Sequence, residues 1–219
     1  MTIIGFLGIG IALVLAITLH EAGHGLVAFM LGDRTAKRAG RMTLNPIKHI
    51  DPIGTILLPG SLLVAGVPFL FGYAKPVPVD FSRLRWGRLG TALVAGAGPF
   101  INLSLAFFSA LFLHINGQAV TLGNDILVHS VQINIMLAIF NMLPLLPLDG
   151  GRVLHAALPR FLQKPMEALE PYTFLLLIGC ILMPLLTQQL LGHPIEILRE
   201  ILLPPYQFTL KHILFLTGH

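Results

Sequence analysis

The chain has 219 residues, of which 55% are hydrophobic and only 11% are charged, and its mean hydropathy is +0.82. Soluble domains carry about 25% charged residues, so this composition excludes a soluble globular protein and indicates a membrane protein. The net charge of +4 does not indicate a nucleic-acid-binding protein, because long apolar segments separate the basic residues. The single cysteine, Cys180, excludes an intramolecular disulfide and a cysteine cluster for zinc.

The first apolar segment covers about residues 3–31 and is long enough to cross a membrane, since about 20 helical residues span the hydrocarbon core. A cleaved signal peptide needs a positively charged start, whereas residues 1–33 contain no Lys or Arg. We therefore expect this helix to remain in the mature protein. The sequence His-Glu-Ala-Gly-His, residues 20–24, lies in its C-terminal part.

A basic loop follows, and residues 53–73 are again apolar. Their interruptions make a straight helix doubtful and predict a re-entrant or broken hairpin; they are Pro59, Gly60, Gly66 and Pro68. Residues 72–79 alternate in polarity and contain two prolines, which favours an extended edge segment. We expect a re-entrant and extended membrane-associated segment at about residues 53–79.

The remaining apolar stretches predict further helices. Core helices are expected at about 89–114, which opens with small residues that permit close packing, and at about 126–148. We expect additional helices at about 172–191 and 205–219, the last of them an interfacial helix or a short span, and a short helix at 152–163. The fold class is therefore an all-α polytopic membrane protein with about four to six transmembrane helices, and residues 1–219 form one membrane-embedded domain.

The basic residues predict the orientation. Most of them fall in two loops between residues 34 and 88 and in a third between 152 and 164, whereas residues 89–148 have none. By the positive-inside rule these loops are cytoplasmic, in what we expect to be a prokaryotic plasma membrane. The N-terminus then lies outside, and residues 20–24 lie in the cytoplasmic half of the first span. Residues 53–73 must enter and leave on the cytoplasmic side.

Two histidines four residues apart on a helix share one face, where both can bind the same metal ion, and an intervening glutamate can accept a proton from water. His20, Glu21 and His24 have this arrangement. Inside a membrane a charged side chain costs about 2.5 to 3.5 kcal/mol, so the motif calls for a compensating role. The alternative is a hydrogen-bonded polar cluster that holds helices together.

A catalytic zinc site needs a third protein ligand and an open position for water. The chain has ten carboxylates, and most lie in the basic loops or outside the clearest spans. With Glu21 assigned as base, Asp149 is the remaining candidate, at a helix end unwound by Pro144 and Pro147. Its depth matches that of the two histidines in the predicted topology. The alternative is that Asp149 caps the short helix after residue 150.

The chain resembles the site-2 proteases, which are membrane-embedded zinc metalloproteases. The resemblance covers residues 1 to about 165 and is carried, in the family's order, by residues 20–24, by Ala-Gly-Pro-Phe-Ile-Asn at 97–102 and by Asn-Met-Leu-Pro-Leu-Leu-Pro-Leu-Asp-Gly-Gly at 141–151. It implies one zinc ion per chain. The implied roles are metal ligands for His20, His24 and Asp149, catalytic base for Glu21, and substrate or oxyanion binding for Asn102 and Asn141.

The resemblance further implies an endopeptidase that cleaves transmembrane protein substrates in the lipid bilayer during regulated intramembrane proteolysis. Residues 53–79 resemble the family's membrane-associated loop and strand, and the chain looks like a minimal form without a PDZ domain. A membrane metal-ion transporter is an alternative, although it leaves Glu21 unexplained. A non-proteolytic membrane scaffold is a third possibility, but it gives no reason to keep four costly polar groups. The sequence does not reveal the substrate or the oligomeric state.

Overall fold

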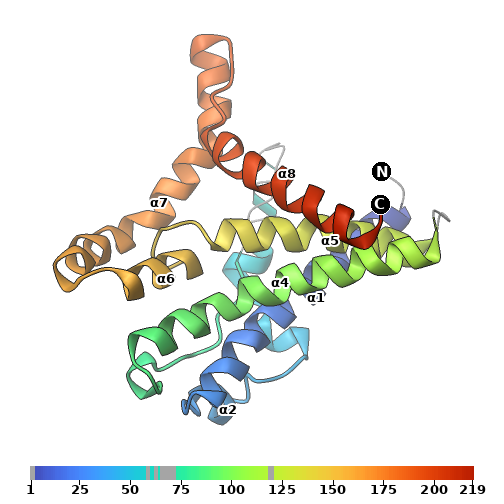
Figure 1. The fold of residues 1–219 in the computed structure, drawn as a ribbon. Helices are drawn as coiled ribbons and strands as arrows, with labels where there is room; N and C mark the ends of the chain where they lie inside the picture. The colour runs from blue at the N-terminus through green and yellow to red at the C-terminus, as the bar shows by residue number, and fades with distance from the viewer. Residues whose placement is uncertain (1–2, 58–59, 62–63, 65–72, 118–120) are drawn as a thin grey trace.

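A computed structural model describes residues 3–57, 60–61, 64, 73–117 and 121–219. Within these ranges the chain is helical and contains no strand, which confirms the all-α prediction (Figure 1). The elements in chain order are α1 (Ile3–Met30), α2 (Thr35–Arg38), η1 (Pro46–His49), η2 (Pro52–Leu57), η3 (Phe81–Arg83), α4 (Arg88–Asn116), α5 (Leu122–Asn141), α6 (Asp149–Ala157), α7 (Arg160–Leu191) and α8 (Ile197–Thr217).

Four of the described helices, α1, α4, α5 and α7, are long and apolar enough to cross a membrane. This number is at the lower end of the predicted four to six and supports a multi-pass membrane protein. The C-terminal tail forms α8, which is not among these four candidates. That residues 1–219 form a single domain stays a prediction.

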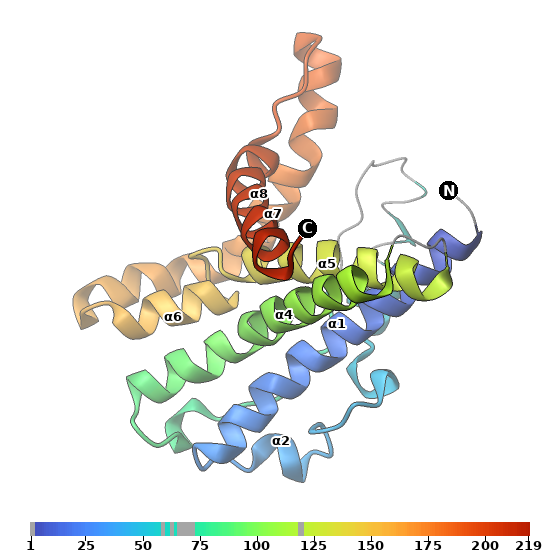
Figure 2. The ribbon, with the colours of Figure 1, turned by 45° about the vertical axis from the view of Figure 1, so that its right-hand side comes forward.

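Helices α1, α4 and α5 lie side by side and form the centre of the molecule (Figure 2). Small side chains let them approach closely, because a lipid-embedded bundle is held by packing contacts and interhelical hydrogen bonds. Ala16 of α1 and Ala106 of α4 are fully buried. A Cβ atom added at Gly23 of α1 would come within 2.3 Å of the Ile101 side chain on α4. This close contact places α1, which carries His20 and His24, against α4.

Helix α8 packs across α4 and α5. Its Ile213 joins a buried cluster with Ala106 and Ala110 of α4 and Val131 and Ile135 of α5. The contact explains why the tail is a well-formed helix despite its two internal prolines.

The ends of the later helices differ from the predictions. Helix α5 ends at Asn141 and does not continue to residue 148, since Pro144 and Pro147 cannot extend it, and residues 142–148 form a turn instead. The short helix expected at 152–163 has other bounds: α6 begins at Asp149 and ends at Ala157, and Pro159 separates it from α7. The crossing expected at 172–191 begins earlier, at Arg160.

Helix α7 is long although it contains three prolines. They lie inside the helix without ending it, at Pro165, Pro171 and Pro184. Each removes one backbone hydrogen bond, and the apolar residues after Pro171 keep the helix packed against α8 through Leu177 and Ile181.

Only part of the segment at 53–79 belongs to the described residues. Residues 52–57 form the π-helical turn η2, and the Tyr73 backbone N–H donates to the Gly54 carbonyl, which brings the two ends of the segment together. Residues 58–59, 62–63 and 65–72 lie outside the described residues, and the predicted re-entrant path falls mainly there. Residues 73–80 are in neither a helix nor a strand, so the strand suggested by the family resemblance does not form among these described residues.

Two buried charged residues tie residues 73–80 to the end of α1. The Asp33 carboxylate accepts from the Asp80 backbone N–H at 2.8 Å and from Thr35, and the Arg41 guanidinium donates to the Lys75 carbonyl at 2.6 Å. Burial by itself would raise the pKa of Asp33, but the hydrogen bonds from Thr35 and Asp80 outweigh it and hold the pKa below its ordinary value.

Replacing Asp33 with alanine is expected to loosen residues 73–80, because the Asp80 N–H loses its acceptor, a loss of about 1 to 3 kcal/mol for a buried group. In the wild type the anchoring is present at neutral pH and is lost only when the pH falls through the lowered pKa of Asp33. Hydrogen exchange of residues 73–80, followed by mass spectrometry, measures this. Unchanged protection in the variant would contradict the anchoring role.

Candidate metal centre

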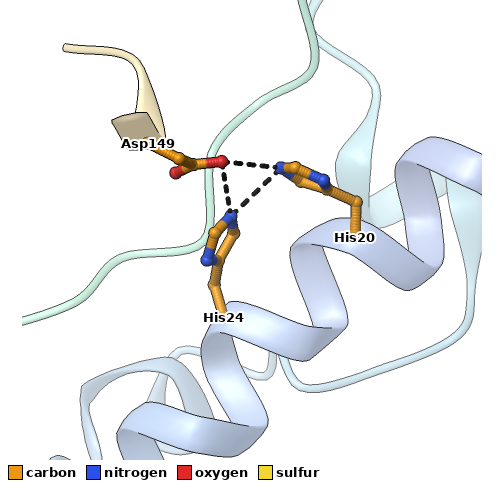
Figure 3. Close-up of side chains that lie close together, drawn as sticks. All are labelled: His20, His24 and Asp149. Carbon is orange, nitrogen blue, oxygen red and sulfur yellow. Dashed lines mark hydrogen bonds and ion pairs between the residues drawn. The ribbon is translucent and has the colours of Figure 1, made fainter. Parts of the chain in front are cut away.

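His20 and His24 of α1 meet Asp149, the first residue of α6, in one cluster (Figure 3). The two imidazole Nε2 atoms are 3.1 Å apart. The Asp149 Oδ2 atom lies 3.2 Å from the Nε2 atom of His20 and 3.4 Å from the Nε2 atom of His24. Both histidines are buried, with 7% and 9% of their surface exposed. The structure therefore brings together the three residues that sequence reasoning selected as metal ligands.

The spacing of these three atoms fits a zinc ion. With metal–ligand distances of about 2.0 to 2.1 Å, two ligands of a tetrahedral zinc ion lie about 3.3 Å apart. The observed separations of 3.1 to 3.4 Å agree with this value. The buried Asp149 Oδ2 atom has no hydrogen-bond donor among the described residues. A divalent cation satisfies all three atoms at once.

Hydrogen bonds from α4 fix the orientation of both imidazole rings. The His20 Nδ1 atom lies 2.5 Å from Asn102 Oδ1, and the His24 Nδ1 atom lies 2.7 Å from the Val94 carbonyl oxygen. Both partners are acceptors, so each Nδ1 carries the proton and donates it. Each Nε2 is then left with a lone pair directed into the cluster, which is the tautomer that metal binding requires.

Asn102 is fully buried and links three helices. Its side-chain amide donates to Asn134 Oδ1 on α5 at 2.7 Å and to the Ala16 carbonyl on α1 at 3.3 Å, which leaves its oxygen as the acceptor for His20. Sequence reasoning placed Asn102 near the site but missed Asn134. An asparagine in the middle of an apolar span was the signal that could have found it.

Glycines allow the backbone to approach the cluster. A Cβ atom at Gly98 of α4 would lie 2.5 Å from His20 Cε1 and from His24 Nε2. Next to Asp149, a Cβ atom at Gly150 would lie 2.2 Å from the Met142 carbonyl oxygen. Only glycine fits at either position, so Gly98 makes room for the imidazoles and Gly150 lets α6 start against the turn at 142–148.

The alternative in which Asp149 caps a helix is not observed. The N-cap position of α6 is Leu148, and no side-chain hydrogen bond caps that end. The Asp149 carboxylate is directed at the two histidines instead (Figure 3).

The other predicted residues have different partners. The Glu21 carboxylate accepts a hydrogen bond of 2.8 Å from the Val77 backbone N–H, so it is held on the side of residues 73–80. The Asn141 side-chain amide donates to the Leu137 carbonyl of its own helix at 2.9 Å. Asn102 lies behind His20, where it positions a ring.

Replacing Asn102 with alanine is expected to weaken zinc binding by about 10- to 100-fold, because His20 loses the acceptor that fixes its tautomer. A competition titration with a chelator measures the zinc affinity. Ser104→Ala on the same helix is the matched control, since the Ser104 hydroxyl donates to the Phe100 carbonyl of its own helix. Equal zinc affinities in the two variants would show that Asn102 does not support the site.

A helical membrane protein with a buried His-His-Asp cluster of zinc-like geometry is a candidate membrane metalloenzyme, and comparisons with known proteins define the class further. The family model for Peptidase family M50 matches residues 115–186, which include Asp149. The chain is 42% identical over 183 residues to "Putative zinc metalloprotease YwhC" of Bacillus subtilis (strain 168), a match that covers 80% of each protein.

More distant relatives carry the name "Putative zinc metalloprotease Rip2". The one from Mycolicibacterium smegmatis is 26% identical over 80% of this chain and 66% of its own length, and that from Mycobacterium tuberculosis (strain H37Rv) is 27% identical over 81% and 67%. No solved structure gives a significant match.

The chain belongs to Peptidase family M50, the site-2 protease family, and is a zinc metalloprotease. The predicted family, enzyme class and metal are confirmed, and nothing in the comparisons supports the transporter or scaffold alternatives.

Proposed function

We propose that this protease hydrolyses peptide bonds within the transmembrane segments of other membrane proteins. In this proposal His20, His24 and Asp149 are the zinc ligands and Glu21 is the general base. The observation that carries it is the place of the cluster: both histidines are buried in α1, a helix apolar enough to cross a membrane. A substrate must therefore reach the site from within the bilayer.

A zinc ion held by His20, His24 and Asp149 would lower the pKa of a water molecule and polarise a peptide carbonyl. Glu21, next to His20 on α1, accepts the proton from water and then passes it to the leaving nitrogen. Asn141 donates to the oxygen that gains negative charge. Its side-chain amide has two N–H groups, of which one is bonded to the Leu137 carbonyl and the other is available for this role. Asn102 and Val94 hold the two imidazole rings in place.

Residues 74–79 form a segment with which the backbone of an unwound substrate can pair. A transmembrane helix hides its amides in internal hydrogen bonds, and pairing with an extended segment satisfies them once the helix opens. The same segment contacts the base, since the Val77 N–H donates to Glu21. A substrate strand paired here therefore lies next to the catalytic carboxylate.

We further propose that the N-terminus lies outside and that the site faces the cytoplasm of a prokaryotic cell. The C-terminal end of α1 and the N-terminal ends of α4 and α7 lie on the side of the molecule away from the two chain termini (Figure 2). Basic residues cluster at these three ends, at Lys37 and Arg38, Arg88, and Arg160 and Lys164. The positive-inside rule assigns this side to the cytoplasm.

Proteomics of membranes from cells that carry the wild type or Glu21→Gln tests the function and at the same time identifies a substrate. We expect at least one transmembrane protein to accumulate in the variant cells, and the purified wild type to cleave it in detergent. If nothing accumulates and the purified enzyme cleaves no membrane protein, intramembrane proteolysis is refuted.

A further inference from the structure

A second site is indicated by a cavity of about 550 Å³ between α4, α6 and α7. Its polar lining includes Arg88 and Thr91 of α4, Arg152 and His155 of α6, and Arg160 and Glu167 of α7. Neither the three clustered metal-site residues nor Glu21 lines it. The cavity is therefore separate from the candidate metal centre, although α6 borders both.

Positive charge dominates this cavity. Its lining contains three guanidinium groups and two carboxylates, Glu167 and Glu170. The Glu167 carboxylate lies 2.8 Å from His155 Nε2. Arg152 lies over the Phe81 ring at 4.9 Å, and Arg88 donates to the Leu158 carbonyl. Among the described residues, none of the three arginines forms an ion pair with a carboxylate. The lining is left with three cationic groups beside a space large enough for a ligand.

The position of the cavity indicates where such a ligand comes from. Arg88 and Arg160 are the first residues of two helices that can cross a membrane, so the cavity lies at a membrane surface. Its lining also includes Phe81, Leu146 and Ala156, which are apolar. Cationic pockets between membrane helices on the cytoplasmic side suit anionic lipid headgroups, and guanidinium groups bind phosphate oxygens in pairs.

We propose that this cavity binds a phosphate group, carried by an anionic phospholipid of the surrounding membrane. Arg152 and Arg160 are the principal ligands, and Arg88 closes the site from α4. A phosphate bound there links α6 to α4 and α7, and thus steadies the helix that begins with Asp149. The inference concerns binding and does not depend on the proposed proteolysis.

Native mass spectrometry of delipidated protein in a neutral detergent tests this, with phosphatidylglycerol, phosphatidylcholine and inorganic phosphate as separate probes. We expect the wild type to bind phosphatidylglycerol in preference to phosphatidylcholine, and the variant Arg152→Gln/Arg160→Gln to bind it about tenfold more weakly or worse. Lys164→Gln/Lys211→Gln is the matched control, because it removes two cations that do not line the cavity.

The control variant should bind like the wild type. Equal binding by the wild type and the cavity variant, or an equal loss in the control, overturns the proposal. If inorganic phosphate displaces the lipid, a free phosphate also occupies the site, and if it does not, the phospholipid is the ligand; either result requires the arginines. The single variant Arg160→Gln, at an exposed position, covers the case in which the double variant fails to fold, and zinc content and elution volume report folding.

Discussion

Replacing Asp149 with alanine is expected to remove zinc from the purified protein, with an affinity loss of more than about 100-fold, since even an outer hydrogen-bond partner of a ligand is worth 10- to 100-fold. Two imidazole nitrogens remain in this variant, too few for the ligand set that the geometry describes. His24→Ala should have the same effect. Elemental analysis of zinc per chain, after gel filtration in chelator-treated buffer, gives the measurement.

Two substitutions serve as controls for zinc loss. Asp125→Ala and His212→Ala remove the same kinds of side chain from the start of α5 and from α8, away from the cluster. Both should keep the zinc of the wild type. If Asp149→Ala also keeps its zinc and its affinity, the third ligand is another residue.

Replacing Glu21 with glutamine is expected to lower the turnover of a membrane substrate by about 10²- to 10⁴-fold, the range for loss of a general acid–base group. Zinc should stay bound, because Glu21 is not one of the three clustered residues. Glutamine keeps a carbonyl oxygen that can accept from the Val77 N–H, so residues 73–80 keep their place. Turnover and zinc content are measured on the same preparation.

Glu200→Gln on α8 is the control for the loss of a carboxylate, since Glu200 is exposed. It should retain wild-type turnover. Near-normal turnover in Glu21→Gln would show that another group accepts the proton.

The central residues of the site could be predicted from the sequence because each has a strong local reason. His20 and His24 share a helix face by their spacing, and an intramembrane carboxylate demands a partner. Asp149 was predicted by eliminating the other carboxylates and from its expected depth in the membrane. It lies beside the two histidines. The apolar lengths of α1 and α4 gave their bounds within a few residues.

Long-range partners could not be predicted in the same way. The acceptor for His24 is the Val94 backbone carbonyl, and any residue type offers that group. The tie between Arg41 and the Lys75 carbonyl depends on how a loop folds back along α1. Hydrophobic patterning also does not tell whether a proline ends a helix: Pro159 does so, whereas Pro165 does not, because tertiary packing decides the outcome.

The most direct test of the central claim is to locate the bond that the enzyme cuts. The wild type is reconstituted in liposomes with the membrane protein that accumulates in Glu21→Gln cells, and the products are mapped by mass spectrometry. We predict a cut inside the apolar spanning segment of the substrate, which disappears in Glu21→Gln and on zinc removal. Cuts confined to the parts of the substrate outside the bilayer, or cleavage that persists in Glu21→Gln, would contradict an intramembrane zinc protease.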